Sequence, residues 1–206
     1  MLSNLYIVSS CAISNNIVRK NKEKIFTSGA DNIQSFLLSV YQHLKIDYPK
    51  FYKMDNLSKL GFLASEVLLK DEKELIVHPE KTGLVLCNAN SSLDTDVKYF
   101  ESAKEIPSPA LFVYTLPNIV MGEICIRNKF KGENAFFVSD DFDTGLINKY
   151  VSELFANNIL EFCICGWIDV LEENYKAVLF LVSTKHDHEA LLFTEQNMNS
   201  IFNNIP

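Results

Sequence analysis

The acidic residues Asp140, Asp141 and Asp143 are the first place where residue type and spacing suggest chemistry. They follow the apolar run 134–139, which is typical of a short strand, and they open the amphipathic stretch 143–157, which is typical of a helix. A strand that runs directly into a helix places the residue at the bend beside the free amides of the helix N-terminus. A nucleophile at such a bend is activated, and a cysteine there is biased toward its thiolate.

Asp141 occupies the bend itself, and a carboxylate at this place has limited chemistry. Its attack on a thioester would form a mixed anhydride, which is more reactive than the thioester, so acyl transfer would be unfavourable. Its charge would also repel an incoming carboxylate. Acids at a helix N-terminus cap free amides and contribute roughly 0.5 to 2 kcal/mol each. The pattern therefore predicts a capping role for Asp140, Asp141 and Asp143, and no confident catalytic residue.

Neither the cysteines nor the histidines offer a better catalytic group. His43 lies on a predicted peripheral helix, and His78 precedes a predicted strand. His186 and His188 follow the last predicted strand, where an exposed loop is favoured over a metal site. We therefore expect no metal and no cofactor. The cysteines lie inside apolar runs, which is typical of reduced packing residues in a reducing compartment: Cys11, Cys87, Cys125, Cys163 and Cys165.

Strand and helix patterns alternate along the chain and predict an α/β fold. Apolar residues recur at helical spacing over 31–44, 54–69, 116–128 and 143–157, and turn formers open a further helix that ends near Ala103. Short apolar runs predict strands over 5–11, 82–87, 134–139, 160–171 and 176–184, the last two joined as a hairpin. Residues 15–24 are polar and basic, and we expect an exposed connection there. Residues 185–206 predict a tail with one short helix.

The stretch 108–143 resembles the N-terminal half of the β-ketoacyl-acyl-carrier-protein synthases, the condensing enzymes of the thiolase fold. In that family a loop of the type S-P-x-F-V leads through an Asn into a buried helix, and a later glycine begins the segment that carries the acyl-accepting Cys. The matching residues are Ser108, Pro109, Leu111 or Phe112, Val113, Asn118, Gly122 and Gly132. Nine residues after Gly132, Asp141 stands in the Cys position. Looser matches over 51–69 and 81–100 extend the resemblance across most of 48–184.

The resemblance implies a thiolase-like half, a three-layer α/β/α arrangement with a mixed five-stranded sheet. Residues 1–206 would form a single β-ketoacyl synthase-like N-terminal domain, because the family's C-terminal half, with its two catalytic His and a Lys, has no room in 206 residues. The implied function is a non-catalytic partner subunit in fatty-acid or polyketide biosynthesis, with polyene pigment assembly as one setting. Two alternatives stay open: an acyl-thioester-binding or hydrolysing enzyme that uses Asp141, and one half of a split ketosynthase.

The resemblance also implies partners. In the family, the strand before the bend pairs with its mate across a two-fold axis, and the loop before the buried helix reaches toward the partner's pocket. The corresponding residues are Phe112, Val113, Tyr114, Asn134, Ala135, Phe136, Phe137 and Val138. A homodimer, or a heterodimer with a complete ketosynthase, is expected. Arg127, Lys129 and Lys131 are candidates for docking an acyl carrier protein.

The composition of the chain narrows the classes of protein to which it can belong. With 48% apolar residues among 206, the chain can bury a substantial core. Its net charge of −7 provides no basic field for a phosphate backbone, so nucleic-acid binding is not expected. The chain has no apolar run of about 18 residues and no positively charged segment typical of a signal peptide near Met1. We therefore expect a cytoplasmic protein without a membrane span.

Overall fold

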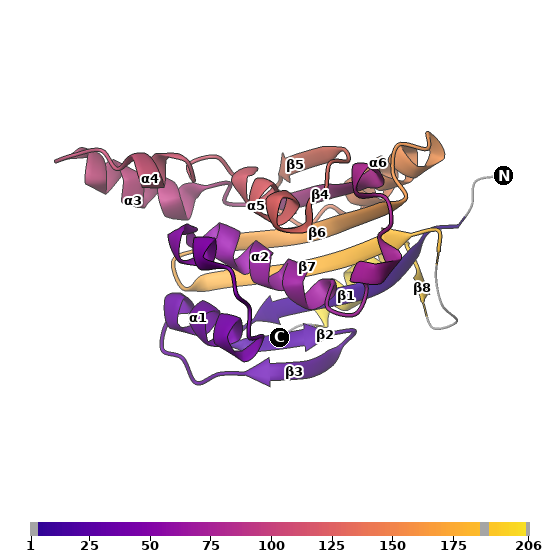
Figure 1. Ribbon diagram of the computed structural model, residues 1–206, viewed down its shortest axis with the longest axis horizontal. Coiled ribbons are helices and arrows are strands. Elements are labelled where there is room, and N and C mark those ends of the chain that lie inside the picture. The colour runs from indigo at the N-terminus through magenta and orange to yellow at the C-terminus, as the bar shows by residue number, and fades with distance from the viewer. Residues whose placement is uncertain (1–3, 186–189, 205–206) are drawn as a thin grey trace.

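One mixed β-sheet runs through the computed structural model, which describes residues 4–185 and 190–204 (Figure 1). The strand order is β3-β2-β1-β7-β6-β4-β5, and β8 pairs with β1. β4, β5 and β6 run parallel, whereas β7 is antiparallel to its neighbours β1 and β6. The strands are β1 (Tyr6–Ser14), β2 (Ile17–Lys20), β3 (Glu23–Thr27), β4 (Thr82–Asn88), β5 (Asn134–Val138), β6 (Phe162–Leu171), β7 (Asn174–Ser183) and β8 (Leu191–Leu192).

Helices cover both faces of the sheet, which confirms the predicted three-layer arrangement. α1, α2 and α5 pack on one face and α6 and α7 on the other, so that each face has its own apolar core. Within 4–185 and 190–204, no helix is both long and apolar enough to cross a membrane. The helices are α1 (Ile33–His43), α2 (Asn56–Leu68), α3 (Leu93–Ala103), α4 (Pro109–Phe112), α5 (Ile119–Asn128), α6 (Thr144–Ala156) and α7 (Glu195–Asn203), with short 3-10 helices at Pro49–Lys53, Lys73–Leu75 and Pro79–Lys81.

The sheet has more strands than the predicted five. One added strand, β8, lies in the segment predicted as a tail with one short helix, and the other two arise because residues 15–24 are not an exposed connection. They contribute to β2 and β3, which continue the sheet beyond β1. The turns fall at Asn15 and Asn16 and at Asn21 and Lys22, where φ lies between 48° and 73°. Two-residue turns between antiparallel strands need this left-handed backbone, and Asn adopts it readily. β3 is an edge strand whose side chains are mostly exposed, so its sequence is polar. The polar composition therefore did not indicate a strand.

The predicted helices over 31–44, 54–69 and 143–157 are confirmed as α1, α2 and α6. Each begins at a capping side chain that accepts a hydrogen bond from an amide three residues on, namely Asn32, Asp55 and Asp143. The helix predicted from residue 116 begins later, as α5. It is also not buried all round, since Ile126 is 61% exposed.

Gly61 sets how closely α2 approaches α5 and the sheet. A Cβ atom at this position would collide with the Val120 side chain of α5 and would lie 2.9 Å from Ile168 Cδ1 of β6. Gly122, within α5, differs because a Cβ there would meet no atom within 4 Å. The same residue type therefore has a packing role in one helix and none in the other.

These two glycines give a matched test of the packing. Gly122→Ala should raise the free energy of unfolding by about 0.5 to 1 kcal/mol, because Ala is the better helix former. Gly61→Ala should instead lower it by about 1 to 3 kcal/mol, because overpacking outweighs the same gain in propensity. Urea unfolding of the two variants measures both changes. A stabilised Gly61→Ala variant would contradict the close packing of α2 on α5.

Candidate functional site

The predicted strand-to-helix bend lies between the end of β5 and the start of α6. Asp141 is in the bend and is exposed, and its backbone carbonyl accepts a hydrogen bond from Ser139 Oγ at 2.7 Å. Of the three acids, Asp143 is the helix cap: its Oδ1 accepts from the Leu146 amide at 2.8 Å. Capping by Asp143 agrees with the prediction, whereas Asp140 and Asp141 are not the residues that cap α6.

Phe142 is the side chain that the bend directs into the protein. It is 7% exposed and lies among three aromatic rings, with its centroid 4.9 Å from Phe202 and 6.2 Å from both Trp167 and Phe180. α7 packs against the start of α6, where Asn199 Nδ2 donates a hydrogen bond to Thr144 Oγ1 at 2.9 Å. The interior side of the bend is therefore filled by an aromatic residue that the sequence analysis did not single out.

The backbone amides after β4, beside the bend, are already bonded within the chain. Asp169 Oδ1 accepts from the Ala89 and Asn90 amides at 3.2 and 3.0 Å. The Ser91 amide donates to Asn88 Oδ1 at 3.0 Å. Amides at the carboxyl ends of parallel strands are common anion sites, but these three are engaged. These three amides therefore bond to side chains of the protein and are not available to bind a ligand.

Burial makes four of the five cysteine thiols less reactive. Burial raises the pKa of Cys87 to about 12, helped by the negative charges of Asp143 and Asp169. Burial also raises the pKa of Cys11, Cys125 and Cys165, and buried thiols are poor nucleophiles.

Two of the four histidines lie in the described part of the chain. The His43 ring lies 4.4 Å from the ring of Phe26, and His78 Nδ1 lies 3.2 Å from Glu80. His186 and His188 lie outside the described residues. Among the residues that are described, no group of three or more His, Cys, Asp or Glu is placed to hold a metal.

The three basic residues proposed for carrier docking differ in their surroundings. Arg127 donates to both carboxylate oxygens of Glu66, at 3.0 and 3.3 Å, and lies over the Tyr48 ring. Much of its charge is therefore already balanced. Lys129 and Lys131 are exposed on the turn between α5 and β5.

β5 is the last strand of the sheet, and its surroundings are apolar. Phe136 packs with the core beneath α2 and α5, and Phe137 packs on the opposite face against Tyr150. Both stay partly exposed, and Val138 is 57% exposed. Exposed apolar edge strands in general are prone to pair with further strands.

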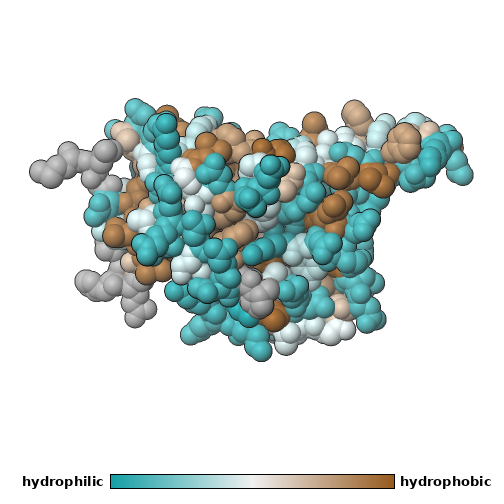
Figure 2. All heavy atoms as spheres, turned by 180° about the vertical axis from the view of Figure 1, so that it is seen from behind, coloured by the Kyte–Doolittle hydropathy of each residue, from teal (hydrophilic) through white to brown (hydrophobic). Residues whose placement is uncertain are grey.

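A projecting arm, residues 93–116, carries α3 and α4 beyond the end of the sheet (Figure 1). Figure 2 shows hydrophobic residues gathered along it and at its root. Patches of this kind mark interaction surfaces. Phe112 and Val113 were predicted from the sequence as interface residues. The other members of this patch were not predicted, because scattered apolar residues in a polar helix look like ordinary core positions. The exposed large apolar residues of the arm are Leu93, Val97, Phe100, Ile106, Phe112, Val113 and Leu116, at 43, 54, 66, 83, 60, 50 and 57%.

Tyr114 anchors the base of the arm and does not belong to its surface. It is 8% exposed, and its hydroxyl donates to Glu123 Oε1 at 3.1 Å. Lys50 Nζ lies 2.8 Å from the other oxygen of the same carboxylate. Burial and the charge of Glu123 raise the pKa of Tyr114, so it stays protonated and donates. Its neighbour Val113 is thereby held outward.

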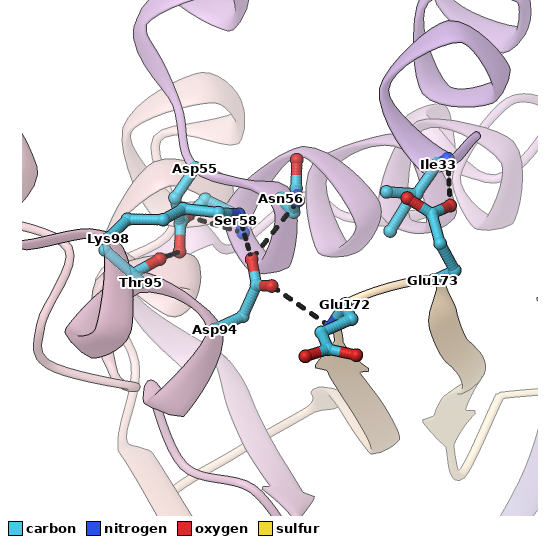
Figure 3. Close-up of polar contacts among 9 residues, drawn as sticks. All are labelled: Ile33, Asp55, Asn56, Ser58, Asp94, Thr95, Lys98, Glu172 and Glu173. Carbon is cyan, nitrogen blue, oxygen red and sulfur yellow. Dashed lines mark hydrogen bonds and ion pairs between the residues drawn. The ribbon is translucent and has the colours of Figure 1, made fainter. Parts of the chain in front are cut away.

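A polar network fixes the start of the arm to the body (Figure 3). Asp94, at the first turn of α3, is 7% exposed and accepts hydrogen bonds from Lys98 Nζ at 2.6 Å and Asn56 Nδ2 at 3.2 Å. Its other oxygen accepts from the Glu172 amide, in the β6–β7 turn, at 3.1 Å. Asp55, which caps α2, also accepts from the Thr95 hydroxyl at 2.7 Å. The arm is therefore a fixed element.

A sizeable hollow lies away from the bend. It has a volume of about 720 Å³ and sits at the far end of α6, between Ser152, Phe155, Leu160 and Phe193. Asp141 is at the other end of the helix and does not line it. The structure thus separates the bend from this hollow.

Comparison with known proteins gives structural matches only. No protein-family model matches the chain. No curated protein matches it in sequence. The structure called "The ishigamide ketosynthase/chain length factor" matches with a TM-score of 0.64 at 17% identity, over 87% of this chain and 62% of that chain. A ketosynthase in complex with its chain length factor from Xenorhabdus doucetiae matches with a TM-score of 0.59 at 14% identity, over 89% and 80%.

A third match is a type II polyketide synthase structure, described as an acyl-carrier protein in complex with its ketosynthase bound to the hexaketide. Its TM-score is 0.60 at 15% identity, over 89% of this chain and 63% of that chain. This chain therefore spans less than two thirds of the length of two of the three. At these identities the likeness shows a shared fold, the thiolase-like fold of ketosynthases.

The polar network predicts a pH dependence of stability. Burial raises the pKa of Asp55 above its ordinary 3.8, so the folded state holds this proton more tightly than the unfolded state. Asp55 therefore costs stability as the pH rises above 3.8, until it is fully ionised. Asp55→Asn keeps a capping side chain. Its free energy of unfolding relative to the wild type should increase between pH 4 and pH 7, as measured by urea unfolding.

Asp55→Ala is the control, because it removes both the charge and the cap. It should follow the same trend with pH, displaced downward by about 1 kcal/mol. A difference between Asp55→Asn and wild type that is flat, or that falls with pH, would refute the role of burial.

Proposed function

We propose that this protein is a non-catalytic ketosynthase-like partner subunit in fatty-acid or polyketide-type assembly. It would associate with another chain of the same fold, either a second copy or a complete ketosynthase. The names of the similar structures describe such associations, of a ketosynthase with a chain length factor or with a carrier protein. The observation that carries the proposal is the apolar edge strand β5, together with the apolar arm that projects beyond the end of the sheet.

The backbone of β5 has one side available for a partner. The Glu133 carbonyl accepts from the Leu84 amide, and the Ser139 amide donates to the Asn88 carbonyl, so these residues face β4. The amide and carbonyl groups of successive residues in a strand point alternately to its two sides. Those of Asn134, Phe136 and Val138 therefore point away from β4, toward the outside. Antiparallel pairing of this edge with the same edge of a second chain would satisfy them and bury the side chains.

The lack of a reactive group at the bend supports the non-catalytic part of the proposal. Condensation through a thioester needs a nucleophile and donors for the oxyanion. Here the inward side chain is Phe142, and the Asp143 carboxylate already takes the Leu146 amide at 2.8 Å. Residues 139–143, which form the bend, thus carry the exposed carboxylate of Asp141 and the cap Asp143 but no cysteine. A carrier protein, if it docks, would meet Lys129 and Lys131, because Arg127 is held by Glu66.

A charge placed on the outer edge tests the pairing. Val138→Lys puts two like charges near a two-fold contact, and we expect the dissociation constant of the dimer to rise by about tenfold or more. Light scattering over a concentration series measures it. Ile25→Lys, on the edge strand β3 at the opposite side of the sheet, is the matched control and should leave the dimer unchanged.

Two further results would separate the partners. A dimer of the isolated protein indicates a second copy, whereas a monomer that forms a one-to-one complex with a complete ketosynthase indicates a heterodimer. A protein that stays monomeric both alone and with a ketosynthase would refute the proposal.

The enzymatic alternative has its own test. If Asp141 acts as a base, it would take a proton from the water that attacks an acyl thioester, and Asp141→Ala would lose turnover. We expect no hydrolysis of acyl-coenzyme A thioesters above background, and no change on substitution, measured by free-thiol release. Turnover that depends on Asp141 would establish an enzyme in place of a partner subunit.

A further inference from the structure

A small cavity lies under the C-terminal end of α7, between that helix and the β1–β2 hairpin. Its volume is about 120 Å³. At about 30 Å³ for each water molecule, it has room for about four waters or for one group of the size of a phosphate or a carboxylate. Its lining residues are Ser10, Ala12, Arg19, Lys22, Ser200, Ile201 and Asn204.

Arg19 is the residue that makes this cavity unusual. It pairs in register with Ala12 of β1, so its side chain lies on the α7 face of the sheet. Its Nη1 atom is buried and has no hydrogen-bond partner in the part of the chain that the structure describes. A buried donor without a partner costs about 1 to 3 kcal/mol, and more when it is charged. A bound ion, in addition to the residues that the structure describes, would satisfy this donor.

Neighbouring cations show that the chain does provide partners elsewhere. Lys20, the next residue along β2, lies 2.6 Å from Asp71. Lys176 Nζ donates to the Phe202 carbonyl at 2.8 Å and thereby serves the negative end of α7. The dipole of α7 favours a cation below it, but it supplies no hydrogen bond to Arg19 Nη1. Attraction to the helix end therefore does not account for the unpaired donor.

The lining of the cavity has the character of an anion site. Arg19 and Lys22 bring two positive charges, and no Asp or Glu lines the cavity within the described residues. The Ser200 hydroxyl and the Asn204 amide add polar groups from α7. A guanidinium fork with an ammonium beside it matches the oxygens of a phosphate or a carboxylate. We propose that this cavity binds one small oxyanion, held by Arg19 and Lys22 and bridging the hairpin to α7.

Thermal unfolding of the full chain, with inorganic phosphate or acetate titrated at constant ionic strength against sodium chloride, tests the site. The wild type should show a saturable rise in Tm with phosphate or acetate that sodium chloride does not produce. Arg19→Met should abolish the rise, and without the anion it should be no less stable than the wild type, because the unpaired donor is gone. Lys22→Gln should weaken binding by about tenfold. Lys24→Gln, on β3 and outside the cavity, should leave it unchanged.

Two more measurements complete the test. Phosphoethanolamine that binds as well as inorganic phosphate indicates a phosphate carried on an ester, and binding of the inorganic ion alone indicates a free ion. Lys22 lies on an exposed turn, so Lys22→Gln keeps the test valid if Arg19→Met does not fold. No saturable shift in the wild type, or an equal shift in both variants, would overturn the site.

Discussion

Burial of both faces of the central strands is the constraint on which the rest of this structure depends. Every residue of β4 is buried, and β6 and β7 are buried along most of their length. Strands covered on both sides leave only the ends and the outer edges of a sheet for contact with other molecules. At the carboxyl ends, Asp169 and Asp143 already bond the nearby amides. The exposed apolar surface lies on the outer edge, β5, and on the arm that projects beyond the end of the sheet.

The polar network explains how an apolar arm can project without collapsing onto the body. Asp94 joins the first turn of α3 to the start of α2 and to the β6–β7 turn. Glu123 joins Tyr114 and Lys50 near the other end of the arm. Charged and hydrogen-bonded groups require specific geometry, whereas apolar contacts do not. The arm is therefore held at both ends in one orientation, which is a condition for a surface that receives a defined partner.

Local patterns were enough to predict most elements, because the helices have strong apolar periodicity and capping residues such as Asp55. The hairpin of β2 and β3 was not predicted, although Asn is a residue type that favours left-handed turns, and Asn21 adopts that conformation here. At the bend, Asp141 lies where it was expected, but the inward direction of Phe142 was not foreseen. A shift of one residue along the chain changes which side chain faces the core. The choice between Asp141 and Phe142 depends on packing against the rest of the protein, which a local pattern does not contain. The pairing of Arg127 with Glu66, 61 residues apart, is likewise beyond a local pattern.

The two outer strands of the sheet are unequal. β3 exposes Glu23 and Lys24, and charges of this kind discourage further strands from adding, whereas β5 is mostly apolar. If two chains pair through β5, the apolar edge of each chain is covered by the other. The two outermost strands of the combined sheet are then the charged β3 strands. Growth stops after a single addition. The hairpin that lengthens the sheet would thus also protect the protein against polymerising into fibres.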